Sequence, residues 1–239
     1  MLVWKNQNPW TALRGQFYDV FLDQNGGFYG YMHAARPLHV QLNLNDSALC
    51  VVNHTLSDAM NQTVEAHLFD LKGKRLSIQR FREDIPANSV RVAEKADLAK
   101  KPTTLYFLRL VLKNEKGEIV DENLYGLTNK PTDLQELETL ADASLQLKIT
   151  KNEGKKCGVT IKNTGSETAF FIRLKVWNTN TDQIVAPVFF SDNYFTLFPD
   201  EKKDIDVDLS LLPAELKEDA NLVLKAEIGN RKAEQIAIH

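Results

Sequence analysis

The hydrophobic period of this sequence changes near Arg36-Pro37, and this change limits the fold more than any other feature. From Leu38 to Leu44 apolar residues alternate with polar ones, which is typical of a half-buried β-strand. Similar short runs, separated by turn residues, continue to the end of the chain. Because proline imposes an extended backbone on the residue before it, we place the first domain boundary at Arg36-Pro37. The sequence therefore predicts a mainly β protein after this point.

Residues 37–130 are expected to contain roughly seven or eight short strands joined by regular turns, which is the pattern of an immunoglobulin-like β-sandwich. Asp70–Lys74 has the composition of a hairpin turn, and Asn114–Gly117 is a second turn. The expected strands are 38–44, 49–52, 64–69, 76–81, 87–92, 105–113 and 119–127.

Thr128–Thr132 marks a second boundary, and residues 131–239 predict a second immunoglobulin-like sandwich. Asp133–Leu140 is expected to form a short helix. The expected strands are 145–150, 156–162, 169–177, 184–190, 203–209, 221–228 and 233–238. Thr55–Asp58 and Thr164–Glu167 begin about 109 residues apart, a spacing that suits tandem domains of this size. Because this repeat is only four positions long, coincidence stays open.

Residues 1–36 differ from the rest of the chain. Met1–Trp4 is a short apolar run, typical of a buried strand. The next apolar residues recur at spacings of three and four, which predicts one face of an amphipathic helix. They are Trp10, Leu13, Phe17 and Phe21. Gly26-Gly27 is expected to end this helix, and residues 28–35 allow another helical turn or two.

Several short pieces of the sequence occur in an order that carries a resemblance. They are Trp4-x-x-x-Asn8-x-Trp10, Gln16–Asp19, Gly26–Tyr31, Ala35–Gln41, Val51–Thr55, Tyr106–Leu110 and Ser191–Glu201. In this order, along nearly the whole chain, they resemble the C-terminal part of glycoside hydrolase family 2. Within that family the pieces are most similar to the mannosylglycoprotein endo-β-mannosidase and exo-β-glucosaminidase branch. No single piece is decisive, and the shared order carries the signal.

The resemblance implies a catalytic (β/α)8 barrel followed by immunoglobulin-like domains, with residues 1–36 as the last strand-helix unit of the barrel. In that family the acid and the nucleophile are two glutamates on earlier barrel strands, which this sequence does not contain. The resemblance therefore implies the accessory region of a retaining glycosidase that acts on β-linked glycans. It also implies that the chain is inactive alone.

Trp4, Asn8 and Trp10 are the candidate substrate-binding residues, within an intact parent enzyme only. The resemblance places them at the last barrel strand and the loop after it, beside the sugar pocket. An indole face can stack on a sugar ring, and an amide can bind hydroxyl groups. The alternative is that Trp10 is a core residue and Asn8 caps the helix before Pro9. No catalytic residue is expected in this chain.

Other candidate residues have structural interpretations. Asp192–Phe195 could be a binding loop or a corner in which Asp and Asn side chains hold a turn, and we favour the corner. His39 alternates with apolar residues and is expected on the outer face of its strand. Cys50 and Cys157 fall in different sandwiches, and we expect both to be buried free thiols.

The composition is that of an ordinary soluble globular protein, with 43% hydrophobic residues, 26% charged residues and a net charge of −3. Basic residues are scattered, so no nucleic-acid partner is expected. No apolar run approaches the roughly 20 residues that cross a bilayer, so no membrane partner is expected. We expect no cofactor and no metal, since no histidines have metal-ligand spacing. A bacterial periplasm or cytoplasm is the expected location.

Three functions are open. The chain could support a barrel catalytic domain in cis, it could be a subunit that completes a barrel supplied by another chain, or it could be a stand-alone carbohydrate-binding or adhesion protein. For the last, Trp177 is the best stacking platform. The apolar side of residues 1–30 could fold back onto the first sandwich, associate with a second copy or another chain, or be poorly ordered.

Overall fold

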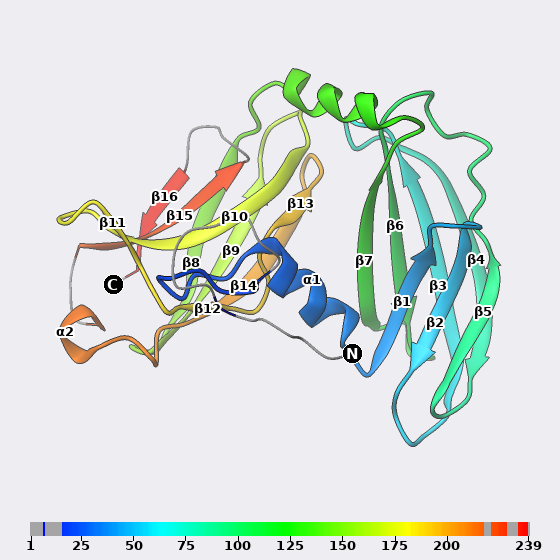
Figure 1. Cartoon of the computed structure of the whole chain (residues 1–239), viewed down its shortest axis with the longest axis horizontal. Helices are drawn as coiled ribbons and strands as arrows, with labels where there is room; N and C mark the ends of the chain where they lie inside the picture. The colour runs from blue at the N-terminus through cyan, green and yellow to red at the C-terminus, as the bar shows by residue number, and fades with distance from the viewer. Residues whose placement is uncertain (1–6, 8–15, 218–220, 229–233, 239) are drawn as a thin grey trace. The chain divides into compact units, whose positions relative to one another are not determined.

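The computed structural model describes residue 7 and residues 16–217, 221–228 and 234–238. These residues form two compact units (Figure 1). One unit is residues 32–140, and the other combines the described parts of residues 1–31 and 141–239. The domain boundaries that the sequence suggests at 36/37 and 130/131 stay predictions.

Residues 32–140 form a mainly β unit of two antiparallel sheets, with strand orders β1-β2-β5 and β4-β3-β6-β7. The elements are β1 (Leu38–Asn43), β2 (Ala48–Asn53), β3 (Ala59–Phe69), β4 (Arg75–Ile85), β5 (Ser89–Lys95), β6 (Tyr106–Lys113), β7 (Ile119–Leu127) and the 3₁₀ helix η1 (Pro131–Thr139). The alternating apolar residues of both sheets share one core. Its fully buried members include Val40, Leu49, Val51, Val64, Leu110 and Leu112.

Side chains of β7 cover the edge of β1, which is the end strand of the other sheet. The Asp121 carboxylate accepts hydrogen bonds from the Val40 N–H at 2.8 Å and from Arg36 Nη1 at 2.7 Å. Tyr125 Oη accepts one from the Leu42 N–H at 3.0 Å. Because an unpaired strand edge is a template for aggregation, these alternate side chains of β7 protect β1.

His39 lies on the face of β1 opposite the core, as predicted, but it is buried there. Its Nδ1 lies 2.8 Å from Asp121 Oδ2. Burial would raise the pKa of Asp121, but hydrogen bonds from His39, the Val40 N–H and Arg36 hold the pKa of that carboxyl below its ordinary value. The alternation of the sequence thus locates the face of His39 but not the carboxylate that covers it.

The described parts of residues 141–239 form the second pair of antiparallel sheets. One sheet has the order β12-β14-β9-β8, and the other has the order β11-β10-β15-β16 with β13 also paired to β10. The elements are β8 (Leu145–Asn152), β9 (Lys156–Asn163), β10 (Ala169–Asn178), β11 (Gln183–Val185), β12 (Phe189–Phe190), β13 (Phe195–Leu197), β14 (Lys202–Asp208), α2 (Ala214–Lys217), β15 (Leu222–Ile228) and β16 (Glu234–Ala237). The strand expected at 184–190 is two short strands in different sheets.

A buried asparagine builds the corner after β2. Asn53 is the last residue of that strand and is fully buried. Its side-chain amide donates to the carbonyl oxygens of Ser57 and Ile85 at 3.0 and 3.2 Å. Its Oδ1 accepts a hydrogen bond from the Thr55 N–H at 2.9 Å. One side chain therefore satisfies the backbone of the loop and of a neighbouring strand.

The same corner follows β9 in the other unit. Asn163 ends that strand, is fully buried, and donates to the carbonyl oxygens of Glu167 and Leu197 at 2.8 and 3.0 Å. Its Oδ1 accepts from the Gly165 N–H at 3.0 Å. The weak sequence repeat is thus a repeat of structure, although the equivalent residues are Asn53 and Asn163 rather than the two threonines that the sequence aligns.

The opening segment differs most from its prediction. A helix was expected to end at Gly26-Gly27, but α1 (Gly26–Ala34) begins there. Asn25 caps this helix, because its Oδ1 accepts a hydrogen bond from the Phe28 N–H at 3.1 Å. The described residues 16–25 are not helical, so the apolar spacing in this segment does not mark a helix face.

Candidate functional site

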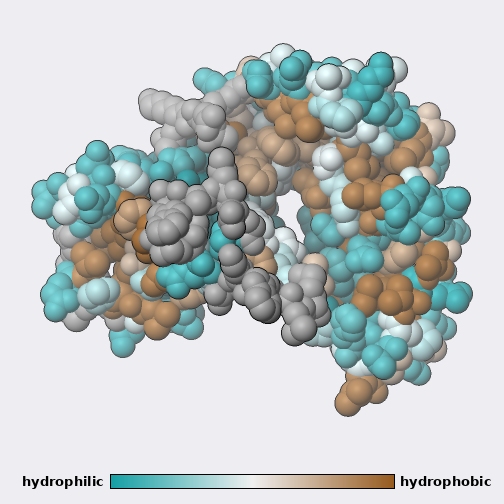
Figure 2. Space-filling view, in the orientation of Figure 1, coloured by the Kyte–Doolittle hydropathy of each residue, from teal (hydrophilic) through white to brown (hydrophobic). Residues whose placement is uncertain are grey.

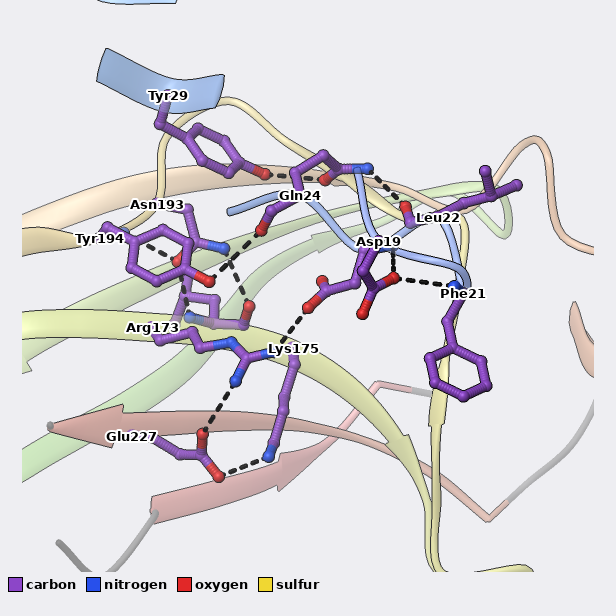
Figure 3. Close-up of polar contacts among 12 residues, drawn as sticks. Asp19, Phe21, Leu22, Gln24, Tyr29, Arg173, Lys175, Asn193, Tyr194 and Glu227 are labelled. Carbon is purple, nitrogen blue, oxygen red and sulfur yellow. Dashed lines mark hydrogen bonds and ion pairs between the residues drawn. The ribbon is translucent and has the colours of Figure 1, made fainter. Parts of the chain in front are cut away.

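Trp4, Asn8 and Trp10 lie outside the described residues, so their substrate-binding role stays a prediction. The described residues of the opening segment up to Tyr31 belong to the same compact unit as residues 141–239 and pack against that sandwich. We call this contact the seam (Figure 3). It joins Asp23, Gln24, Gly26 and Tyr29 to Phe171, Arg173 and Tyr194. Glu227 of β15 pairs in turn with Arg173.

Ion pairs form the polar side of the seam. Arg173 and Lys175 are two residues apart on β10, so both side chains leave the same face of the sheet. Arg173 Nη2 lies 2.5 Å from Asp23 Oδ2, and Lys175 Nζ lies 2.5 Å from Glu227 Oε1. Arg173 Nη1 also lies 4.0 Å from Glu227 Oε2. Burial raises the pKa of Asp23, and Arg173 opposes this rise. Figure 3 shows the resulting alternation of carboxylates and cations across the segment and two strands.

Two tyrosines form the less polar side of the seam. Tyr29, 1% exposed, donates its hydroxyl to Gln24 Oε1 at 3.0 Å. Tyr194 donates its hydroxyl to the Gln24 carbonyl oxygen at 3.3 Å. Burial raises the pKa of Tyr194 to about 12, and burial also raises the pKa of Tyr29, so both hydroxyls stay protonated at neutral pH. Gly26 permits this close approach, because a Cβ atom there would lie 3.2 Å from Phe171 Cζ.

Asp192–Phe195 is a structural corner, as we favoured. Asn193 Oδ1 accepts a hydrogen bond from the Leu174 N–H at 2.7 Å, and its Nδ2 donates to the Leu174 carbonyl oxygen at 2.9 Å. The Asn193 side chain therefore takes the place of a strand neighbour beside β10. Asp192 Oδ1 accepts from the Asn193 N–H at 2.8 Å. Because Tyr194 comes next, this corner places the tyrosine that binds the opening segment.

Trp177, the candidate stacking platform, lies on the same face of β10 as Lys175. The Nζ atoms of Lys175 and Lys225 lie 4.6 and 4.1 Å from its ring centroid. The indole Nε1 donates to Asp182 Oδ1 at 3.2 Å. These lysines make cation–π contacts, so a sugar ring stacked on the indole would compete with two ammonium groups.

The carboxylates of the seam are paired with cations. Asp23 and Glu227 each pair with a cation of β10. No group of three or more His, Cys, Asp or Glu side chains in the described part of the chain could hold a metal ion. None of the helices described here is long and apolar enough to cross a membrane. Cys50 and Cys157 are free and buried, as predicted.

Sequence reasoning missed the seam, because its partners are far apart in the chain. Asp23 and Arg173 are separated by 150 positions, and no local pattern connects them. A partial signal was present on β10, where Arg173, Lys175 and Trp177 alternate with apolar residues. A strand face that carries two cations and an aromatic residue indicates that this face contacts polar groups of another segment.

Two family models match the sequence. Residues 45–129 match the mannosidase Ig/CBM-like domain, and residues 123–226 match the exo-beta-D-glucosaminidase Ig-fold domain. The chain is 30% identical to a mannosylglycoprotein endo-beta-mannosidase of Lilium longiflorum, over 87% of this chain and 28% of the relative. It is 29% identical to an exo-beta-D-glucosaminidase of Hypocrea jecorina, over 87% of this chain and 26% of the relative.

Two solved structures share the fold. The exo-chitosanase CsxA of Amycolatopsis orientalis has a TM-score of 0.82 and 24% identity, over 97% of this chain and 30% of its own. A beta-D-mannosidase from Dictyoglomus thermophilum has a TM-score of 0.67 and 20% identity, over 96% of this chain and 26% of its own. The chain therefore spans less than a third of each protein that it matches here.

Proposed function

The chain carries the immunoglobulin-like domains of the mannosidase and exo-β-D-glucosaminidase branch of glycosidases, and from this premise we propose that it is the C-terminal accessory region of a retaining glycoside hydrolase family 2 enzyme. The enzyme hydrolyses β-linked mannose or glucosamine in glycans. One observation carries the proposal: both family models match in order, within a chain that spans 28% and 26% of the two relatives.

In the proposed enzyme a barrel catalytic domain supplies the chemistry, in cis or as another chain. Retaining hydrolysis uses two carboxyl groups about 5 Å apart, and the accessory region does not supply them. The region is therefore inactive alone. Trp4, Asn8 and Trp10 line one wall of the sugar pocket, as part of the last strand-helix unit of the barrel. The support for these roles is the sequence resemblance.

The seam gives the second sandwich a specific task in this proposal. It holds residues 16–31, which lie within the proposed last barrel unit of residues 1–36, through the Asp23–Arg173 ion pair and the Tyr29 and Tyr194 hydroxyls. A segment that is held by both a charged and an apolar contact has already lost conformational freedom when the barrel is assembled. The accessory region thus positions the last barrel unit.

The first experiment is to read the DNA that flanks the coding region and to assay the products. We expect a barrel catalytic domain in frame or in a neighbouring gene. The purified 239-residue chain should release no nitrophenol from nitrophenyl β-mannoside or β-glucosaminide, whereas the chain together with the catalytic domain should. Turnover by the chain alone, above a blank, would contradict the proposal.

The pocket residues are tested in the same assembled enzyme. Trp4→Ala should lower kcat/KM about tenfold or more, since a lost sugar–aromatic contact removes transition-state binding. Trp177→Ala is the matched control and should leave kcat/KM unchanged, because its ring contacts Lys175 and Lys225 instead. Binding of glycans by the chain alone, abolished by Trp177→Ala, would support the stand-alone carbohydrate-binding function instead.

A further inference from the structure

We propose that Asn25 is a modification site. Its side-chain amide is hydrolysed through a cyclic imide formed with Gly26, the seam slows this reaction, and the product weakens the seam. The inference does not depend on the proposed function, because the residues that carry it all belong to the compact unit that contains the second sandwich.

The sequence singles out Asn25, the one asparagine of the chain that is followed by glycine. In an Asn-Gly pair the glycine nitrogen can reach the asparagine Cγ atom with little hindrance, because glycine has no Cβ atom and adopts backbone conformations that other residues avoid. Asn25 is also exposed, so water reaches it. Exposure alone would not single it out, since hydrophilic residues cover much of the face in view (Figure 2).

The reaction needs only the chain and water. The Gly26 nitrogen loses its proton and bonds to Cγ of Asn25, the bond from Cγ to Nδ2 breaks, and Nδ2 leaves as ammonia with that proton. Water then adds to either carbonyl carbon of the cyclic imide. Cleavage of the adjoining C–N bond gives an aspartate or an isoaspartate. Gly26 is the first residue of α1, so its N–H has no acceptor within the helix that the attack would have to displace.

The Asn25 side chain is held by two hydrogen bonds in the folded chain. Its Oδ1 accepts from the Phe28 N–H at 3.1 Å, and its Nδ2 donates to the Gln16 carbonyl oxygen. The departure of Nδ2 breaks the second bond. An attack also needs the nitrogen and Cγ in one particular orientation, whereas these bonds fix the side chain as a helix cap. The folded chain should therefore react more slowly than the unfolded chain.

The main chain beside Asn25 is fixed by the seam. The side-chain and main-chain oxygens of Gln24 accept hydrogen bonds from the Tyr29 and Tyr194 hydroxyls, at 3.0 and 3.3 Å (Figure 3). Closure of the imide ring requires rotation of the main chain between Asn25 and Gly26. The rate should therefore follow how often the seam opens locally.

The product cannot restore the original contacts. An ionised aspartate has no N–H to donate to the Gln16 carbonyl oxygen. It also adds a carboxylate to a segment that already holds Asp19 and Asp23, and like charges repel at short range. Burial and the Asp19 charge already raise the pKa of Asp23. An isoaspartate additionally inserts a methylene group into the main chain where α1 begins. Either product should weaken the seam.

Mass spectrometry of peptides tests the site. The purified chain is kept at mildly alkaline pH, and the peptide that contains Asn25 is followed for the mass change expected when oxygen replaces an NH group. Arg173→Gln removes the partner of Asp23 and should speed the conversion about tenfold, because loss of a charged contact makes local opening more frequent. Lys151→Met, in an exposed pair of the same unit, is the matched control and should convert at the parent rate. The chain in urea should convert fastest.

Hydrogen exchange tests the consequence. Converted and unconverted protein differ in charge and can be separated by ion exchange. The converted protein should show faster exchange in β10 and unchanged exchange in β3, which lies in the other unit. Asn25→Asp carries the new charge without the isoaspartate and should show the same direction of change.

The results that would overturn the proposal are separate from those that concern the proposed function. No mass change at Asn25 in urea would reject the modification site. Equal rates in the folded parent, in Arg173→Gln and in urea would show that the seam does not slow the reaction. Unchanged exchange in β10 of the converted protein would reject the weakening of the seam. The flanking DNA and the glycosidase assays are unaffected by any of these outcomes.

Discussion

Asp23 Oδ2 lies 2.5 Å from Arg173 Nη2, although the two residues are 150 positions apart in the chain. The Asp23 side chain is 19% exposed and that of Arg173 is 34% exposed, so the pair is partly shielded from water. Through it, a segment that precedes the first sandwich in the sequence becomes part of the second.

Breaking the ion pair should destabilise the unit of residues 141–239. Asp23→Asn should lower its free energy of unfolding by about 1–2 kcal/mol, since Arg173 would lose a charged partner in a partly buried site. Urea unfolding by circular dichroism measures the shift. Lys151→Met is the control, because the Lys151–Glu153 pair is well exposed and such pairs contribute less than about 1 kcal/mol. Equal shifts for both variants would show that the pair adds no stability.

Asn193→Ala should cost more than the ion-pair variant. It leaves the N–H and the carbonyl oxygen of Leu174 without their side-chain partner in a buried place, and each unsatisfied buried group costs about 1–3 kcal/mol. Asn180→Ala, in an exposed turn, should stay within about 0.5 kcal/mol of the parent. Thermal unfolding of both variants gives the comparison. An Asn193→Ala variant with the same unfolding temperature as the parent would refute the role of the Asn193 side chain as a hydrogen-bonding neighbour of β10.

Acid should destabilise the unit of residues 32–140 through Glu65. Burial alone would raise the pKa of Glu65, but hydrogen bonds from Lys113, His67 and Arg80 lower the pKa from 4.5 to about 2. A carboxyl whose folded pKa is depressed adds stability above its unfolded pKa and loses it as pH falls to the folded value. Roughly 3 kcal/mol should therefore be lost between pH 4.5 and pH 2.

The variant Glu65→Gln isolates this effect. It should be less stable than the parent at pH 7 and should show a flatter loss of stability below pH 4.5. Denaturant unfolding at a series of pH values measures both slopes. If the free energy of unfolding falls in parallel with pH for the variant and the parent, Glu65 is not responsible for the loss of stability in acid.

The two cysteines should react only after unfolding. Burial raises the pKa of both Cys50 and Cys157, so neither access nor thiolate formation favours reaction in the native protein. A thiol reagent should titrate two groups in denaturant without reductant and almost none in buffer. A count of zero in denaturant would reveal a disulfide and contradict the free thiols.

Removal of residues 1–35 should weaken the second sandwich. The deletion removes Tyr29 and Asp23 from the seam and uncovers the contacts of Phe171 and Tyr194. Hydrogen exchange should show faster exchange in β10 and β13 and little change in β1 and β2. Unchanged exchange in β10 would show that the seam contributes nothing to the sheet.

The strands could be predicted from the sequence because a half-buried sheet imposes a period of two on residues such as Leu38, Val40 and Leu42. The opening helix could not, because the spacing of Phe17 and Phe21 agrees with a helical period while the carboxylate of Asp19 forms a turn between them. Local side-chain bonding of this kind competes with helix formation. The candidate site was beyond prediction for a different reason, since its partners Asp23 and Arg173 are 150 positions apart and no local pattern connects them.

The buried asparagines at the ends of β2 and β9 have a consequence for how such tandem domains diverge. Each corner is centred on one buried asparagine that binds backbone groups of its loop, and in the first corner the Thr55 hydroxyl also donates to the Ser57 carbonyl oxygen, so only the exposed side chains of the loop are free to change. Leu56, in one of these loops, is 94% exposed. Two copies of a domain can therefore drift apart in sequence until only a single asparagine records their common geometry, and a search for further copies should be aligned on that residue.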